Sequence, residues 1–172
     1  MNRHMHNDNL PAVPKNRIVL LGASNLTLSL RLIIQLMQHQ FGGPSEILVA
    51  AGHGRSYGKF SQVLFRGLPG ITECGLWQQF ELTKTCPTYA LLTDVGNDIP
   101  YEYTPDQILL WIGYCVEQLQ KQAAHVVMTN IPIESIERLP ERRYKFLRNI
   151  LYPSCRLSKY EVVDRAMTVH QG

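Results

Sequence analysis

The chain has 172 residues, of which 45% are hydrophobic and 18% are charged, a composition that suits one folded domain and excludes a disordered or collagen-like chain. The formal net charge is +3, and no stripe of Lys and Arg alternates with aromatic residues, so we expect no nucleic-acid partner. The apolar runs are far shorter than the roughly 20 residues that a membrane-spanning helix needs, so we expect no membrane span.

The N-terminal residues and the cysteines indicate where the protein is expected to reside. Residues 1–16 are polar and lack the apolar stretch of a secretory signal, so we expect a flexible lead-in before a single domain over residues 17–172. The four cysteines show no Cys-x-x-Cys spacing, which favours buried free thiols in a reducing compartment over a disulfide framework or a zinc site. We therefore expect a cytoplasmic protein.

The first third of the chain reads as strand, helix and strand. Residues 17–21 (RIVLL) form a short continuous apolar run that ends at a glycine, which is typical of a strand buried on both faces. Apolar residues then recur at helical spacing over 26–37, and the helix is expected to end near 42–44 (GGP). A second strand is predicted at 46–51, and it leads into a glycine-rich loop at 52–58.

The middle of the chain is less regular. Residues 59–86 mix aromatic residues with Gly and Pro, and we expect turns with one short helix near 75–83. A third strand at 89–93 opens into the loop 94–98 (DVGND). Residues 104–107 (TPDQ) then predict a helix start, because the Thr can cap the helix, Pro suits the first turn and Gln completes a capping box.

The last third adds a predicted strand at 125–129 and helices at 139–151 and 157–170. Apolar strands that alternate with helices predict βαβ units and a parallel sheet with helices on both faces. Function in such sheets lies in the loops that leave the carboxyl ends of the strands. Three of these loops, at 22–25, 52–58 and 94–98, carry small residues and groups able to do chemistry.

Ser24 lies on the turn between the first strand and the first helix. The free N–H groups and the positive end of a helix favour an alkoxide or a tetrahedral oxyanion at such a place, which suits a nucleophilic serine. The alternative is that Ser24 only caps the helix, and this loop taken alone fits that alternative better.

The other two loops have the same double interpretation. The glycine spacing at 52–58 is G-x-G-x-x-x-G, which matches neither common phosphate-binding pattern, so a nucleotide site has little support. Asn97 can donate its side-chain amide to an oxyanion, and Asp98 can orient a neighbouring loop or bind a cation. Each loop taken alone is also explained as an ordinary turn at the end of a strand. That explanation does not account for three such loops at the same edge of the sheet.

Taken in order, residues 22–25, the glycine loop and residues 96–98 resemble the first three sequence blocks of the SGNH (GDSL-like) hydrolases, over about residues 17–172. The resemblance implies a flavodoxin-like three-layer α/β/α sandwich with a parallel sheet, and hydrolysis of a small-molecule ester or acyl bond. It implies that Ser24 is the nucleophile and that the oxyanion hole comes from the Ser24 N–H, the Gly52 N–H and the Asn97 side chain. A hydrolase of this kind requires no metal and no cofactor.

Neighbouring residues of the same loops are expected to contact the substrate. We expect Asp98 and His53 to do so from the third and second blocks, and Tyr101 to line an acyl pocket. The first block departs from the family pattern, since Ala23 stands where Asp is usual and Asn25 stands where Leu is usual. Neither change removes a catalytic group.

The general base is the larger departure. In the family it comes from an Asp-x-x-His pair near the C-terminus, and the last third of this chain has no such pair. Asp164 and His170 are six residues apart on a predicted helix, where they lie on roughly opposite faces. The sequence stops at Gly172, where a last strand would begin. We therefore expect that strand and its His loop to be absent, unless another histidine serves as the base, and hydrolysis to be weak.

Two other functions stay open. The first is an SGNH-like module, catalytically impaired or a truncated fragment without activity, that binds a small ligand, and the missing Asp-x-x-His pair favours it. The second is a nucleotide- or flavin-binding doubly wound domain, which the lack of a phosphate loop disfavours. A missing strand would also leave an open sheet edge, and such an edge predicts a homodimer.

Overall fold

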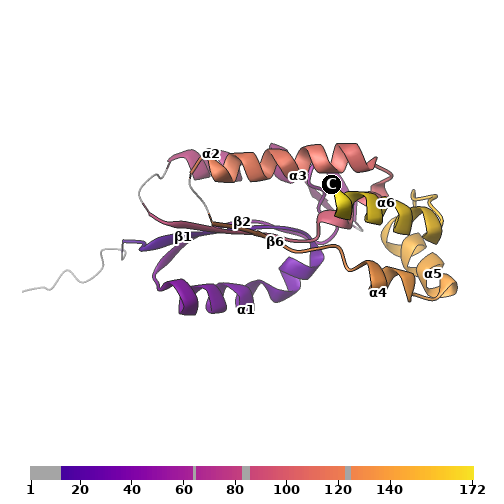
Figure 1. The fold of residues 1–172 in the computed structure, drawn as a ribbon, viewed down its shortest axis with the longest axis horizontal. Helices are drawn as coiled ribbons and strands as arrows, with labels where there is room; N and C mark the ends of the chain where they lie inside the picture. Colours follow the sequence, from indigo (N-terminus) through magenta and orange to yellow (C-terminus); the bar gives the residue numbers. More distant parts are fainter. Residues whose placement is uncertain (1–12, 64, 83–85, 123–124) are drawn as a thin grey trace, which may run out of the picture.

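The computed structural model describes residues 13–63, 65–82, 86–122 and 125–172. It is an α/β fold built on a four-stranded parallel sheet with the strand order β2-β1-β5-β6. These strands are β1 (Asn16–Leu21), β2 (Ser45–Ala50), β5 (Thr88–Leu92) and β6 (His125–Met128). With helices on both faces of the sheet (Figure 1), the arrangement matches a flavodoxin-like three-layer sandwich, so the predicted fold class is confirmed.

The helices fall into three groups (Figure 1). α1 (Ser24–Phe41) covers one face of the sheet, and α2 (Leu76–Leu82) and α3 (Pro105–Gln120) cover the other. Three further helices lie beyond the carboxyl ends of the strands, and α6 packs against both α3 and α4. Their bounds are Ile133–Glu137 for α4, Glu141–Leu151 for α5 and Lys159–Gln171 for α6. This C-terminal group forms part of the wall around the strand ends.

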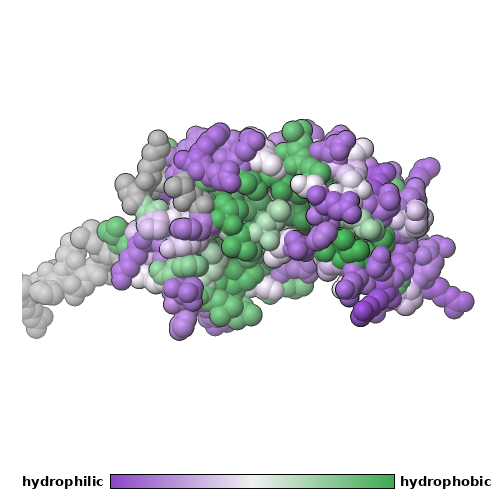
Figure 2. Space-filling model, viewed as in Figure 1, coloured by the Kyte–Doolittle hydropathy of each residue, from purple (hydrophilic) through white to green (hydrophobic). Residues whose placement is uncertain are grey.

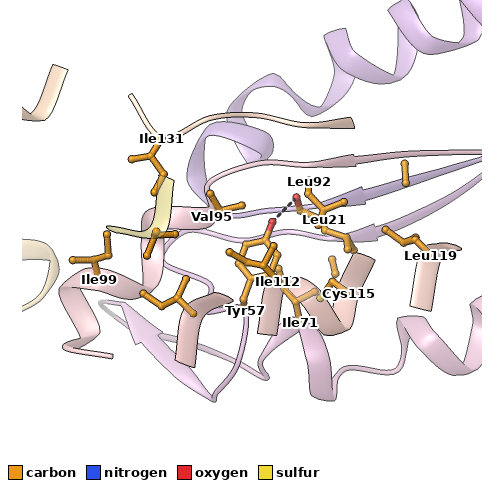
Figure 3. Packing of buried hydrophobic residues seen from close by; sticks show 14 of the residues in the cluster. Leu21, Tyr57, Ile71, Leu92, Val95, Ile99, Ile112, Cys115, Leu119 and Ile131 are labelled. Carbon is orange, nitrogen blue, oxygen red and sulfur yellow. Dashed lines mark hydrogen bonds between the residues drawn. The ribbon is translucent and has the colours of Figure 1, made fainter. Parts of the chain in front are cut away.

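β1 divides the core into two parts because successive side chains of a strand point to opposite faces. Ile18 and Leu20 pack with Leu26 beneath α1, in the smaller cluster of buried residues. Val19 and Leu21 belong to the larger cluster on the other face. Figure 3 shows this larger cluster, which extends from α3 to the loops at the carboxyl ends of the strands. The strand is buried along its whole length, as its continuous apolar run predicts.

The four sheet strands and the helices α1, α2, α3, α5 and α6 are confirmed at their predicted places, and each predicted end agrees to within a few residues. The capping box at the start of α3 is present, since the Thr104 hydroxyl accepts from the Gln107 N–H at 3.3 Å and the Thr104 N–H donates to the Gln107 side chain at 3.0 Å. Residues 1–12 of the predicted lead-in lie outside the described residues, and β1 already begins at Asn16.

Two sequence predictions are corrected. The segment 59–86, expected to hold turns and one short helix, also contains an antiparallel hairpin of β3 (Ser61–Val63) and β4 (Arg66–Leu68), followed by the short 3₁₀ helix η1 (Ile71–Glu73). Strands of three residues are too short to show an alternating pattern. The helix α4 was not predicted, because five residues are too few for a helical repeat.

Two findings on the described residues limit the kinds of site present. In residues 13–172, apart from the undescribed gaps, no helix is long and apolar enough to cross a membrane. Nor does any group of three or more His, Cys, Asp or Glu side chains in that part of the chain lie close enough to hold a metal ion.

Cys115 is a buried free thiol whose pKa is raised to about 12 by burial.

Candidate active site

A pocket of about 440 Å³ opens at the carboxyl end of the sheet. Its wall comes from the loops after β1, β5 and β6 and from α4 and α6, which places it at the sheet edge where the sequence predicts function. Apolar groups form most of the wall, and four of the lining residues, Val95, Ile99, Ile131 and Val162, belong to the main core cluster. Figure 3 labels the first three. Polar groups are contributed by Ser24, Asn25, Thr93, Asp94, Asn97, Thr129 and Asn130.

Ser24 is the first residue of α1 and lies half-buried on the pocket wall. The residue before it, Ala23, is the N-cap and has no side chain that could accept a hydrogen bond. The first helical bond of α1 runs from the Thr27 N–H to the Ala23 carbonyl at 3.1 Å. Within the described residues the backbone N–H groups of Ser24 and Asn25 have no acceptor, and both residues lie on the pocket wall.

Asn97 lies in the 3₁₀ helix η2 (Val95–Tyr101) and lines the same pocket. Its side-chain amide is held at both ends: the Nδ2 group donates to the Arg55 carbonyl at 2.9 Å, and Oδ1 accepts from the Tyr152 hydroxyl at 2.9 Å. Burial raises the pKa of Tyr152 well above its usual value of 10, so this phenol stays protonated and can donate. One amide N–H of Asn97 is left without an acceptor in the described part of the chain.

Gly52 follows β2 and is buried, but it does not lie on the wall of this pocket. Its carbonyl accepts from the Arg55 N–H at 3.1 Å, which closes a turn. A Cβ at this position would come within 2.2 Å of a Leu68 methyl group, so the hairpin packs directly on the glycine. The structure therefore brings Ser24 and Asn97 to one pocket and places Gly52 behind it.

Asp98 is completely buried and accepts hydrogen bonds from the Ser56 hydroxyl and, at 2.8 Å, from the Tyr57 N–H. Burial raises the pKa of this carboxyl from its usual 3.8 to about 6, and the two hydrogen bonds oppose the increase. Asp98 does not lie on the wall of this pocket. The carboxyl instead holds the glycine loop against η2, which is the orienting role that the sequence also offered.

The two other expected substrate contacts are also off the pocket wall. His53 is exposed on the turn after β2. Tyr101 donates its hydroxyl to the Gly54 carbonyl at 2.6 Å and packs edge-on against Tyr152, with 5.1 Å between the ring centroids. Gly54 has a φ of +66°, a conformation that glycine adopts without strain. Tyr101 thus braces the glycine loop.

No histidine among the described residues lies on the pocket wall. Asp164 and His170 both belong to α6 and are exposed, so they do not form an orienter and base pair beside Ser24. The residue that α6 presents to the pocket is Val162. The described residues therefore supply a candidate nucleophile and oxyanion donors without a neighbouring histidine.

Sequence reasoning missed two residues that shape this site. Asp94 lines the pocket and contacts the start of α1, and the signal for it was its position as a carboxylate two residues after a buried strand. Tyr152 lies 55 residues away from Asn97 in the chain, and no local pattern announces a contact over that separation.

Comparisons with known proteins give a likeness of fold. No family model and no curated protein matches the sequence. Among solved structures, the carbohydrate acetylesterase family member from Sinorhizobium meliloti superposes with a TM-score of 0.51 at 10% sequence identity, over 90% of this chain and 74% of that chain. At this identity the comparison shows that the two proteins have similar folds.

Proposed function

We propose that this protein is an SGNH-type serine hydrolase that acts on an ester or related acyl bond of a small molecule, with Ser24 as the nucleophile. The observation that carries the proposal is that Ser24 and Asn97 share one pocket, each with an N–H group that has no acceptor in the described part of the chain. The fold likeness to a carbohydrate acetylesterase agrees with the same class of chemistry.

The proposed reaction begins when the Ser24 hydroxyl oxygen attacks the carbonyl carbon of a substrate in the pocket and its proton passes to a solvent water. Negative charge then develops on the carbonyl oxygen, and hydrogen-bond donors that are already in place stabilise it. The Ser24 N–H is one such donor, and the free amide N–H of Asn97 is the second. The Gly52 N–H enters the proposal as a third donor on the SGNH resemblance alone. The tetrahedral intermediate then expels the substrate's alcohol, which takes up a proton, and a water molecule hydrolyses the acyl-serine to release the acid.

The apolar part of the wall is suited to the acyl or alcohol portion of the substrate. Ile131, Ile136 and Val162 line the pocket beside the polar groups. A volume of about 440 Å³ lies within the usual range for small-molecule sites, roughly 300–1,000 Å³. Burial of apolar substrate groups there would hold the reactive carbonyl near Ser24.

The absence of a histidine from the described pocket wall limits the expected rate. Without an adjacent base, a serine site keeps only the catalysis that the oxyanion donors and binding provide, roughly 10³–10⁴-fold over water. The same observation favours the second candidate function, an SGNH-like module that binds a small ligand without turnover. The two are separated by whether Ser24 reacts.

The test compares the wild type with Ser24→Ala and with Ser29→Ala, which makes the same change at an exposed serine of α1. Hydrolysis of p-nitrophenyl acetate is measured, and covalent labelling by a fluorophosphonate is located by peptide mass spectrometry. We expect turnover and labelling to be lost in Ser24→Ala and kept in Ser29→Ala. Asn97→Ala is expected to lower the rate by about 10²–10³-fold. Equal turnover in the wild type, Ser24→Ala and Ser29→Ala would refute Ser24 as the nucleophile. If the wild type shows no reaction, the ligand-binding module is favoured.

A further inference from the structure

Asp94 connects the loop after β5 to the start of α1. Its backbone is left-handed, with φ 60° and ψ 28°, a conformation that few residues other than Gly, Asn and Asp adopt readily. This turn directs the carboxylate toward the loop that carries Ser24, although the two residues are 70 positions apart in the chain. Asp94 also lies on the pocket wall.

The carboxylate accepts three hydrogen bonds from the N-cap and the first turn of α1. Its Oδ2 atom accepts from the Ala23 N–H at 2.8 Å and from the Leu26 N–H at 3.2 Å, and its Oδ1 atom accepts from the Asn25 side-chain amide at 2.6 Å. The Leu26 N–H belongs to the third residue of α1, which is the group that an N-cap side chain normally satisfies. The N-cap Ala23 has no such side chain, so Asp94 caps the helix from another loop.

We propose that Asp94 is the positioning residue for Ser24, an inference that rests on the function proposed above. Its carboxylate takes the N–H groups on either side of Ser24 and Asn25, while those of Ser24 and Asn25 have no acceptor among the described residues. α1 has no acidic residue of its own in the first turn, so Asp94 also supplies the negative charge that a helix N-terminus favours. Ser24 is thereby held in one place relative to Asn97.

The kinetic consequence follows from this geometry. Because Asp94 acts through the loop, its removal is expected to lower kcat for p-nitrophenyl acetate and to leave KM nearly unchanged. A displacement of about 1 Å at a reacting group costs about 100-fold in rate, so we expect a fall in kcat of about 10–100-fold in Asp94→Ala. The matched control is Asp106→Ala, an exposed Asp in the first turn of α3, which is capped by its own Thr104.

A reciprocal exchange separates positioning from a general loss of stability. In Asp94→Asn the carboxamide oxygen can still accept from the Ala23 and Leu26 N–H groups, but its NH₂ group then faces the NH₂ group of Asn25. Adding Asn25→Asp restores an acceptor opposite that donor. We therefore expect Asp94→Asn to lower kcat and the double variant Asn25→Asp/Asp94→Asn to recover most of it.

Amide hydrogen exchange provides a readout that does not need a reaction. In the wild type the Ala23 and Leu26 N–H groups should exchange slowly, and in Asp94→Ala they should lose protection while the β1 amides keep theirs. Suppose that Asp94→Ala loses protection at Ala23 and Leu26 but Ser24→Ala keeps full turnover. That result would refute the proposed function, while the conclusion that Asp94 caps α1 would still hold. The inference is overturned if protection is unchanged, if kcat in Asp94→Ala equals that in Asp106→Ala, or if the reciprocal exchange recovers nothing.

Discussion

The buried carboxyl of Asp98 gives this protein a predictable dependence of stability on pH. In the folded chain its pKa is raised by burial to about 6, against 3.8 in an exposed side chain. Between these two values the folded state keeps a proton that the unfolded state has released. The stabilisation that protonated Asp98 adds to the free energy of unfolding is therefore fully present below about pH 4 and is lost as the pH rises through 6.

The size of the effect follows from the two pKa values. The difference corresponds to about 3 kcal/mol in the free energy of unfolding, lost between roughly pH 4 and pH 7. Asp98→Asn cannot ionise, so this part of the pH dependence should disappear. The Ser56 hydroxyl oxygen already accepts from the Gly58 and Lys59 N–H groups at 3.1 and 3.0 Å, and it therefore donates to Asp98.

This hydrogen-bond arrangement adds a second, constant effect. The Tyr57 N–H and the Ser56 hydroxyl both need an acceptor at position 98, and Asn offers one acceptor and one donor group. The unmet contact should destabilise Asp98→Asn by about 1–3 kcal/mol at every pH.

Urea unfolding at a series of pH values from 4 to 7 measures both effects, with Asp106→Asn as an exposed control. The wild type is expected to lose about 3 kcal/mol more than Asp98→Asn over this interval. Parallel stability curves for the wild type and Asp98→Asn would refute the assignment of the raised pKa to Asp98. A control that deviates as much as Asp98→Asn would do the same.

Three further results are expected. Tyr152→Phe removes the hydrogen bond that holds the Asn97 amide, and we expect about tenfold lower kcat with p-nitrophenyl acetate, a smaller loss than in Asn97→Ala; an unchanged kcat would exclude this support. Gly58→Ala places a Cβ 1.9 Å from an indole carbon of α3 and should lower stability by about 1–3 kcal/mol, whereas Gly113→Ala has open space and should raise it by up to about 1 kcal/mol, both measured by thermal unfolding. β6 is an edge strand, and its Val127 is 61% exposed beside an apolar hollow that Leu36, Phe41 and Leu91 also line. Figure 2 shows apolar side chains gathered over the sheet and α1. Size-exclusion chromatography at rising concentration should therefore show a dimer that Val127→Lys weakens, and a monomer at every concentration would contradict this.

The sheet was predictable from sequence because its strands carry strong local signals. The run RIVLL is apolar on both faces, and Ile18 and Val19 accordingly enter the two different core clusters. The start of α3 was equally predictable, since Thr104 and Gln107 form their capping box within four residues of chain. Parallel strands bring their carboxyl ends together, so the loops with Ser24 and Asn97 were expected at one edge.

The parts that escaped prediction depend on contacts between distant residues. The β3–β4 hairpin has strands of three residues, too short for a periodic pattern. The place of Gly52 behind the pocket depends on the packing of Leu68 from that hairpin. The orientation of the Asn97 side chain depends on its hydrogen bond with Tyr152, the residue that follows α5 in the chain. Side-chain partners of this kind follow from the assembled fold.

The central claim is that one oxyanion can receive hydrogen bonds from both Ser24 and Asn97. A crystal structure of the protein after reaction with a small alkyl phosphonate measures this directly. We predict a covalent bond from phosphorus to the Ser24 hydroxyl oxygen, with a phosphonyl oxygen roughly 2.7–3.1 Å from both the Ser24 backbone nitrogen and the Asn97 Nδ2 atom. An adduct on a different residue, or a phosphonyl oxygen that contacts neither nitrogen, would contradict the account.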